Sequence, residues 1–264
     1  MINVYLAGIG LCAPGMLDWT MGRAVLRGEM PVGSEQPKPA ATLLPPAERR
    51  RSSQATRYAL QAGQEAITQA GLAATQAAVV FASSDGDGEN LHHILESLAQ
   101  PEHEVSPTRF HNSVHNAAAG YWNIATGART PANSIAAYDD SFAAGLLEAA
   151  VQAATENMPV LLAAFDLPLP APLHEVRPTA APFAVALLLT PEPANALARL
   201  KIRLEPMTED GTKMHHPELE ILRAGNPAAR ALPLLQAVAG GQAQRIVLGW
   251  GENNLVIELS HENH

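Results

Sequence analysis

Apolar and polar positions along the first 165 residues follow two alternating patterns. Short apolar runs, which are typical of buried strands, are separated by longer segments in which apolar residues recur every three or four positions, as they do on one face of a helix. The clearest helix is 52–71, because its alanines keep this spacing from Ala59 to Ala70 and Gly71 ends it. The pattern predicts strands at 2–9, 77–83, 132–137 and 159–165, and helices at 18–28, 52–71, 89–99, 112–126 and 140–156.

After residue 165 the pattern is sparser, but it still alternates. Prolines cluster at 31–46 and 159–193, which predicts loops in these regions. The expected elements are strands at 182–190 and 199–205, a helix at 227–239, and a closing hairpin with strands at 244–249 and 254–259. Because strands alternate with helices along most of the chain, the sequence predicts an α/β fold.

Composition and charge exclude several classes of function. The chain has 264 residues, of which 47% are hydrophobic, and this is enough for one large domain or two fused halves. Its net charge is −9 and its only basic run is 49–51, so we expect no nucleic-acid partner. No run approaches the roughly 18 apolar residues that span a membrane. Cys12 is the only cysteine, so an intramolecular disulfide is impossible and a reducing, cytoplasmic location is expected.

The acidic turn after the second expected strand has the sequence Asp85-Gly-Asp-Gly88. It resembles the start of a calcium loop, but the sixth position, where such loops need glycine, is Asn90. The turn is therefore expected to hold acids that cap the following helix.

Two histidines stand out among the candidate polar groups. His111 and His115 are four residues apart, on one face of the helix expected at 112–126. They could bind a metal if a third ligand converged on them, or one could act as a base, or His115 could simply be hydrogen-bonded at an interface. Because no third ligand is identifiable, we expect no metal, and no motif indicates a cofactor.

The stretch SIAAYDDSFAAG, residues 134–145, places Asp139 and Asp140 where a strand is expected to turn into a helix. The positive end of the helix dipole stabilises carboxylates at this point, and one of them can be the N-cap. The alternative is that one carboxylate is a nucleophile or a base.

Several of these pieces, in this order, resemble the β-ketoacyl synthases, which have the thiolase fold. The similar segments are the opening VYLAGIGLCAPG, Gly127-Ala-Arg-Thr-Pro131, the elbow from Ser134 to Ser141, the strand Phe183–Leu189, and the tail Gly249-Trp-Gly-Glu-Asn253. The resemblance implies an α/β, thiolase-like fold related to the layered αβαβα arrangement. It also implies a division into an N-terminal ketosynthase-like half, 1–190, and a truncated C-terminal half, 191–264.

The departures from the family pattern bear on activity. Asp139 stands at the position of the synthases' reactive cysteine. A carboxylate cannot replace a thiolate in transthioesterification without forming a reactive anhydride. The two histidine blocks of the synthases are absent as well, since no His-Gly or Gly-His dipeptide occurs. The resemblance therefore implies a chain that does not condense acyl groups by itself.

Synthase-like chains without the cysteine include the chain length factors, which pair with an active ketosynthase in type II polyketide systems. The segment 106–120 resembles the short variants associated with aryl polyene and related pigment clusters. This resemblance implies a heterodimer with a ketosynthase, in which acyl carrier protein docks on that partner. It also implies that Asp139 acts as a polar plug or helix cap. The implied interface or tunnel candidates are Phe110, His111, Val114, His115, Trp122, Tyr138 and Phe142.

Two other functions remain open from the sequence. Asp139 and His115 could support a hydrolytic or decarboxylating enzyme. Alternatively, the chain could be a stand-alone homodimer that binds acyl chains.

Overall fold

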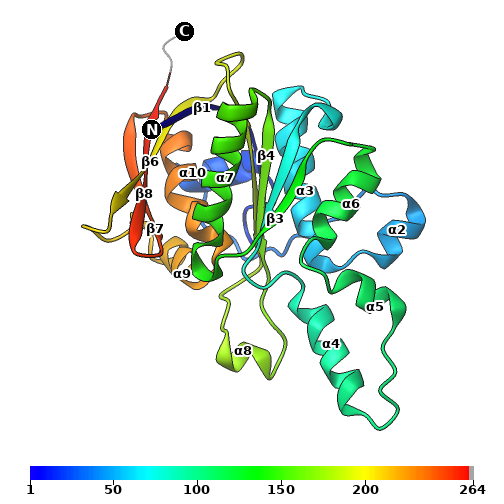
Figure 1. Ribbon diagram of the computed structural model, residues 1–264. Coiled ribbons are helices and arrows are strands. Elements are labelled where there is room, and N and C mark those ends of the chain that lie inside the picture. Colours follow the sequence, from blue (N-terminus) through cyan, green and yellow to red (C-terminus); the bar gives the residue numbers. More distant parts are fainter. Residues whose placement is uncertain (262–264) are drawn as a thin grey trace.

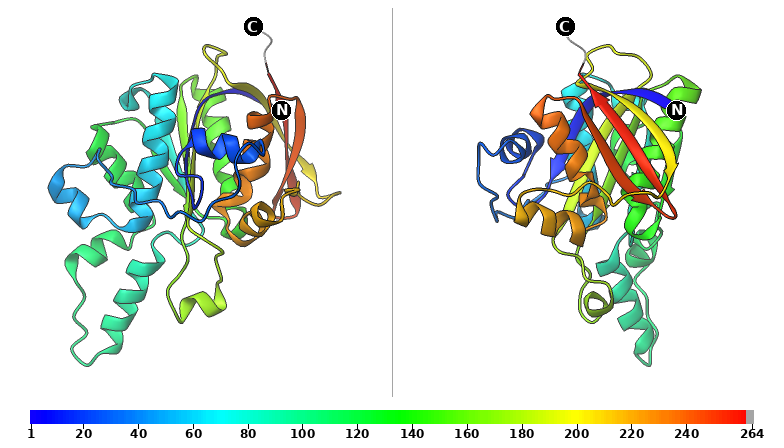
Figure 2. Two further views of the ribbon diagram at one scale, coloured as in Figure 1. Left: turned by 180° about the vertical axis from the view of Figure 1, so that it is seen from behind. Right: turned by 90° about the vertical axis from the view of Figure 1, so that its left-hand side faces the viewer.

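The computed structural model describes residues 1–261, in which eight strands form one mixed sheet with helices on both of its faces (Figures 1 and 2). The order across the sheet is β3-β2-β4-β5-β1-β6-β8-β7. The strands are β1 (Ile2–Cys12), β2 (Ala78–Ala82), β3 (Ala132–Ile135), β4 (Val160–Asp166), β5 (Phe183–Thr190), β6 (Ala198–Pro206), β7 (Gln244–Trp250) and β8 (Asn253–Ser260). The helices are α1 (Trp19–Leu26), α2 (Pro46–Arg51), α3 (Gln54–Ala70), α4 (Gly88–Ala99), α5 (Pro107–Asn112), α6 (Ala117–Thr126), α7 (Ser141–Glu156), α8 (Leu173–Val176), α9 (Pro217–Gly225) and α10 (Leu232–Gly240), with 3₁₀ turns η1 (Ala74–Gln76), η2 (Tyr138–Asp140) and η3 (Ala228–Ala231).

The last part of the chain extends the sheet instead of forming a second one. The pairings β3–β2 and β2–β4 are parallel. All pairings from β4 onward, through β5, β1, β6 and β8 to β7, are antiparallel. Residues 191–261 supply only three strands, which continue from the free edge of β1. The expected relation to a five-layered αβαβα arrangement is therefore reduced here to one sheet between two helical layers.

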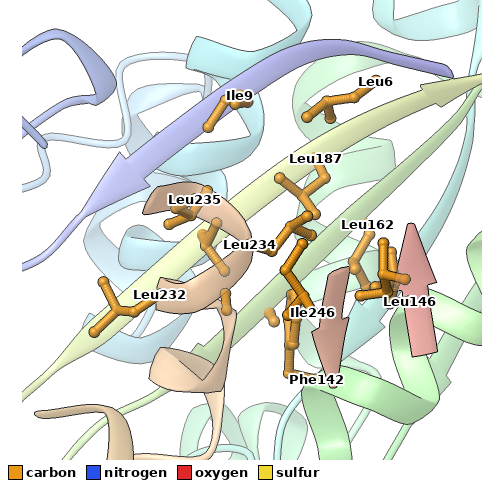
Figure 3. Packing of buried hydrophobic residues seen from close by; sticks show 14 of the residues in the cluster. Leu6, Ile9, Phe142, Leu146, Leu162, Leu187, Leu232, Leu234, Leu235 and Ile246 are labelled. Carbon is orange, nitrogen blue, oxygen red and sulfur yellow. The ribbon is translucent and has the colours of Figure 1, made fainter. Parts of the chain in front are cut away.

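Alternating side chains on the strands divide the core into two parts, one on each face of the sheet. On β2, Val79 and Phe81 face α3 and α6, while Val80 and Ala82 face α7. Figure 3 shows the second core, in which leucines of α10 meet the sheet beside Phe142 of α7. None of the helices within residues 1–261 has both the length and the apolar character needed to cross a bilayer.

Two glycines of β1 let α3 lie directly on the strand. A Cβ on Gly8 would lie 2.1 Å from the carbonyl oxygen of Ala66, and one on Gly10 would lie 1.9 Å from that of Ala62. Because β6 pairs with β1 only through Leu6, amides farther along β1 need other partners. Glu65 of α3 accepts from Leu11 N–H at 2.8 Å, and Gln69 likewise accepts from Ile9 N–H.

Most predicted elements are confirmed, including the ends of α3. Ser53 caps this helix by accepting from Thr56 N–H, and Gly71 ends it with φ of +66°. Asp87 caps α4, as the acidic turn predicted, by accepting from Asn90 N–H. The short helices α8 and α9 were not predicted, and α2 lies at the end of a segment that was expected to be a connection.

The continuous helix predicted at 112–126 is wrong. The helix there, α6, begins only at Ala117, and a turn at 113–116 separates it from α5, which ends at Asn112. The Ser113 hydroxyl donates to the Phe110 carbonyl at 2.8 Å, which offers the backbone an alternative to the helical ladder. The buried Asn112 side chain donates to Arg51 O and accepts from Tyr121 O–H, so it fixes the end of α5 against the body.

The approach of α3 to β1 gives a first prediction. We expect Gly10→Ala to lower the free energy of unfolding of the isolated chain by about 3 kcal/mol, because the new methyl must displace helix backbone. Gly120→Ala is the matched control, since a Cβ there meets nothing within 4 Å and the glycine lies in α6. It should be neutral or stabilise by up to about 1 kcal/mol. Urea unfolding measures both, and equal effects of the two changes would refute the close-packing argument.

Candidate functional site

The chain turns sharply between β3 and α7, and Tyr138 has φ of +52° there. A bulky residue adopts this conformation only when its surroundings enforce it. The Ser141 hydroxyl donates to Tyr138 O at 2.7 Å and accepts from Ala137 N–H at 3.0 Å. The Arg177 guanidinium lies 3.7 Å from the centre of the Tyr138 ring, which is a cation–π contact. The strained elbow is thus held from both sides.

Both acids of the elbow are engaged by arginines from distant parts of the chain. Asp139 Oδ1 lies 2.6 Å from Arg177 Nη1, and its Oδ2 lies 3.3 Å from Arg230 Nη2. Asp140 Oδ1 lies 2.7 Å from Arg230 Nη1, and its Oδ2 accepts from Gly251 N–H at 2.8 Å. All four carboxylate oxygens therefore have a partner.

This pairing corrects the helix-cap interpretation of the elbow. Asp140 occupies the N-cap position of α7, but neither its side chain nor that of Asp139 accepts a hydrogen bond from the helix. The arginines and the hairpin turn at Gly251 take the carboxylate oxygens instead. A guanidinium group carries a full positive charge, whereas the N-terminus of a helix carries only about half of one, so the ion pairs prevail over the cap.

Arg177 also connects the elbow to the end of β2. Its Nη2 donates to Ser84 Oγ at 3.2 Å, and its Nε lies 3.5 Å from Asp85 Oδ2. Burial by itself lowers the pKa of Arg177, but the hydrogen bond and charge of Asp139, together with the charge of Asp85, outweigh burial and raise it. The cluster of Asp85, Asp139, Asp140, Arg177 and Arg230, here called the elbow charge cluster, holds three carboxylates and two guanidinium groups.

A small cavity adjoins the elbow. The adjoining cavity has a volume of about 220 Å³ and is bounded by Tyr138, Asp139, Val176, Arg177 and Arg230, among others. Pockets that bind drug-sized ligands usually measure roughly 300–1,000 Å³. This cavity is smaller than such a pocket, but the Asp139 side chain is 42% exposed, so its pairing with the two arginines and not enclosure engages the carboxylate.

The two candidate histidines lie in different environments. The interruption between α5 and α6 removes the helix face that they were expected to share, so this prediction is wrong. His115 Nε2 lies 3.0 Å from Ser83 O, whereas the His111 ring meets Tyr121 edge-on at 6.2 Å. Within residues 1–261 no three His, Cys, Asp or Glu side chains are grouped as metal ligands. Asp139 and His115 each have other partners, and no hydrogen bond between them occurs in the described part of the chain.

The remaining interface or tunnel candidates divide into exposed and buried side chains. Phe110, Val114 and Tyr138 are exposed, whereas Trp122 and Phe142 are 1% and 0% exposed. Trp122 packs edge-on against Phe81 at 6.4 Å, and Phe142 lies in the core on the other face of the sheet (Figure 3). These two aromatic rings lie in the core of the chain because of their large apolar area, and the interface or tunnel role expected of them stays a prediction.

Asp166 is a buried acid that sequence reasoning missed. It ends β4 with 2% exposure, and its Oδ1 accepts from Ser83 Oγ–H at 3.0 Å and Ser84 N–H at 2.8 Å. Its Oδ2 is buried without a partner. Burial raises the pKa of this carboxyl to about 7, against the hydrogen bonds from Ser84 and Ser83, which lower it. The only signal in the sequence is an acid that directly follows an apolar run.

Arg177 and Arg230 were missed too, because no local pattern marks them. They lie 38 and 90 residues along the chain from the aspartates that they pair with most closely. Arg177 follows α8 within a proline-rich loop, and Arg230 lies in η3.

A family model described as "Beta-ketoacyl synthase, N-terminal domain" matches residues 23–244. A search of curated protein sequences gives no significant match. One solved structure that resembles the chain is a ketosynthase in complex with its chain length factor from Xenorhabdus doucetiae. The TM-score is 0.74 at 26% identity, over 98% of this chain and 100% of that one.

Two further structures resemble the chain in fold. One is the ishigamide ketosynthase/chain length factor, with 14% identity and a TM-score of 0.72 over 98% of this chain and 99% of that one. The other is a type II polyketide acyl carrier protein in complex with its ketosynthase, with 11% identity and a TM-score of 0.74 over the same shares. The fold is therefore thiolase-like, as the sequence predicted.

The buried carboxyl of Asp166 makes stability depend on pH. Its pKa is about 7 in the folded chain and about 3.9 when unfolded. Between these values the folded state binds more protons, so the contribution of Asp166 to stability falls as pH rises from about 4 to about 7. Asp166→Asn removes this loss, and from pH 5 to pH 7 we expect the variant to gain about 2 kcal/mol relative to the native chain in urea unfolding.

The control for this experiment is Asp210→Asn, because the Asp210 side chain is 88% exposed. Its stability curve should run parallel to that of the native chain. If the Asp166→Asn curve does the same, Asp166 is ionised in the folded state throughout this range and the prediction fails.

Proposed function

Because the chain belongs to the family of the β-ketoacyl synthase N-terminal domain, we propose that it is the catalytically silent subunit of a ketosynthase pair, of the chain length factor type. Its partner is a ketosynthase that carries the reactive cysteine. The pair elongates an acyl chain of the polyene or polyketide kind. This subunit stabilises the partner and shapes the tunnel that receives the growing chain.

The elbow charge cluster is the observation that carries the proposal. The position of the nucleophile holds a carboxylate, and both of its oxygens are paired with arginines. An attacking carboxylate would have to leave these pairs and form an anhydride. The only thiol of the chain, Cys12, is 1% exposed at the end of β1, and burial raises its pKa to about 12, so it supplies no thiolate.

The free edge of the sheet supports a partner subunit. β3 pairs with β2 on one side, and within residues 1–261 no strand covers its other side. Unpaired strand edges are templates for a strand of another chain. In the proposed pair, β3 and the neighbouring α6 face the partner across a pseudo-twofold axis. Phe110 and Val114 are exposed apolar side chains on the segment that would reach the partner's acyl chain.

Similarity and charge agree with this arrangement. The structure from Xenorhabdus doucetiae is a ketosynthase with its chain length factor, and the matched chain is covered over its whole length. Acyl carrier proteins are acidic, and the net charge of −9 disfavours their docking on this subunit. We therefore place the carrier on the surface of the catalytic partner.

Coexpression with a ketosynthase encoded beside this chain tests the pairing. We expect the two chains to copurify and to give the mass of a one-to-one heterodimer by size exclusion with light scattering. An obligate interface of this kind buries more than roughly 2,000 Å². A well-behaved monomer or homodimer that ignores the synthase would contradict the proposal, and bound lipid in such a homodimer would favour an acyl-binding protein instead.

In the complex, two substitutions test separately whether Asp139 takes part in catalysis and whether Val114 shapes the acyl tunnel. Asp139→Asn should leave the rate of condensation within about two-fold of native, because in the proposed pair the reactive cysteine belongs to the partner. If Asp139 were the nucleophile, the rate would fall by many orders of magnitude. Val114→Phe should shorten the products, because it adds volume at the surface that faces the partner's acyl chain. Chromatography of products with mass detection measures both variants, with Ile221→Phe on α9, which is 66% exposed, as the control for Val114. A hundred-fold loss with Asp139→Asn, or unchanged products with Val114→Phe, would remove the corresponding role.

A further inference from the structure

Helices α4 and α5 form an arm that projects from the body of the molecule (Figures 1 and 2). Three leucines of α4, namely Leu91, Leu95 and Leu98, are 45%, 46% and 47% exposed. Their spacing of four and three residues places them on one face of the helix. This leucine stripe is unusual, because an exposed helix normally turns its leucines towards the core.

Leucine is not needed at these positions to hold the arm together. The face of α4 that lies against the rest of the arm is made by Asn90 and Ile94, both buried. Asn90 Nδ2 donates to Arg109 O at 2.7 Å, which fastens α4 to α5. The leucine stripe is therefore about half exposed and belongs to neither hydrophobic core of the described chain, and a cluster of exposed apolar side chains of this kind marks an interaction surface.

Both stems of the arm are attached beside the free edge of the sheet. α4 begins just after β2, and α5 leads into α6, which packs near β2 and β3. His115, in the turn after α5, lies 3.0 Å from Ser83 O through its Nε2, and Ser83 N–H donates to Ile135 O of β3 at 3.1 Å. A partner that pairs with β3 therefore meets the root of the arm.

The charge of the arm restricts the kind of partner. The exposed acids Glu89 and Glu96 lie on α4 itself, and Glu102 and Glu104 follow it. His92 Nε2 and His93 Nδ1 lie 3.2 and 3.0 Å from the Glu96 carboxylate. An arm with these exposed acids repels an acidic carrier protein and suits a partner that has an apolar groove and basic groups near it.

From these observations we infer that the leucine stripe of α4 is a docking surface for the ketosynthase partner, in addition to the edge of β3. The inference rests on the proposed function, since it names the same partner. The stripe inserts into an apolar groove of that subunit, and its burial contributes to the affinity of the pair and to the choice of partner.

The test uses the full chain with its ketosynthase partner. We expect Leu95→Glu and the double variant Leu91→Glu/Leu95→Glu to weaken the complex at least ten-fold, measured as Kd by surface plasmon resonance. Glutamate is a good helix former, so α4 persists, and unchanged thermal unfolding of the isolated variant verifies this. The matched control is Ile221→Glu on α9, which is 66% exposed and far along the chain from the arm, and it should leave Kd unchanged.

Hydrogen–deuterium exchange on the native pair gives an independent readout. Residues 88–99 should become protected in the complex and not in the isolated chain. A native complex whose affinity ignores the stripe and whose arm exchanges freely would overturn this inference and leave the proposed function standing. Equal losses in the stripe and control variants, or a stripe that instead joins two copies of this chain, would also overturn it. If the native chains form no complex at all, the proposed function and the inference fall together.

Discussion

The pairing of Asp139 and Asp140 with Arg177 and Arg230 is the interaction on which the arrangement of this molecule depends. These four side chains, with the amide of Gly251, join the elbow after β3, the loop that carries α8, the turn η3 and the hairpin between β7 and β8. Isolated surface ion pairs contribute little to stability, but a partly buried network in which every carboxylate oxygen has a partner specifies one geometry. The elbow that presents a nucleophile in an active synthase serves here to fix distant segments of the chain in position.

The proposed function has two parts, the absence of catalysis within this subunit and the binding of a partner on its outside. Within the subunit, arginines pair with both oxygens of the carboxylate of Asp139, and the proposal of a silent subunit rests on this pairing. Toward the outside, the edge of β3 and the leucine stripe of α4 have no partner within the described chain. The polar groups with partners lie at the elbow, and the exposed apolar groups of α4 lie where the proposed partner would bind.

Asp166 links these regions through Ser83 and Ser84. Its Oδ1 receives hydrogen bonds from both serines, Ser84 Oγ accepts from Arg177, and Ser83 O meets His115 at the root of the arm. A buried acid without a partner on its second oxygen is costly when ionised. Asp166 lies where β2, β4 and the elbow charge cluster meet. Its hydrogen bonds from Ser83 and Ser84 order the turn that leads from β2 to the arm.

The sequence by itself determined the elements and their class. The apolar runs of β2 and β4, the spacing of alanines in α3 and Gly71 at its end are local signals, so they can be recognised without knowledge of the fold. The likeness of the elbow to that of the synthases, and the acid at its centre, were also legible in a single stretch. The helix expected at 112–126 failed because a serine hydroxyl and the buried Asn112 side chain, whose partners lie elsewhere, overruled the local alanine pattern.

Only the tertiary structure decided where the candidate residues lie and which groups they contact. Asp139 could be a cap or a plug until Arg177 and Arg230 were brought to it from 38 and 91 residues away along the chain, a separation that no periodicity encodes. Trp122 and Phe142 have the same residue types as surface anchors, and only their position within the packed layers makes them core. The leucine stripe reads in sequence as an ordinary buried helix face, because a pattern shows which side chains align but not whether anything lies opposite them.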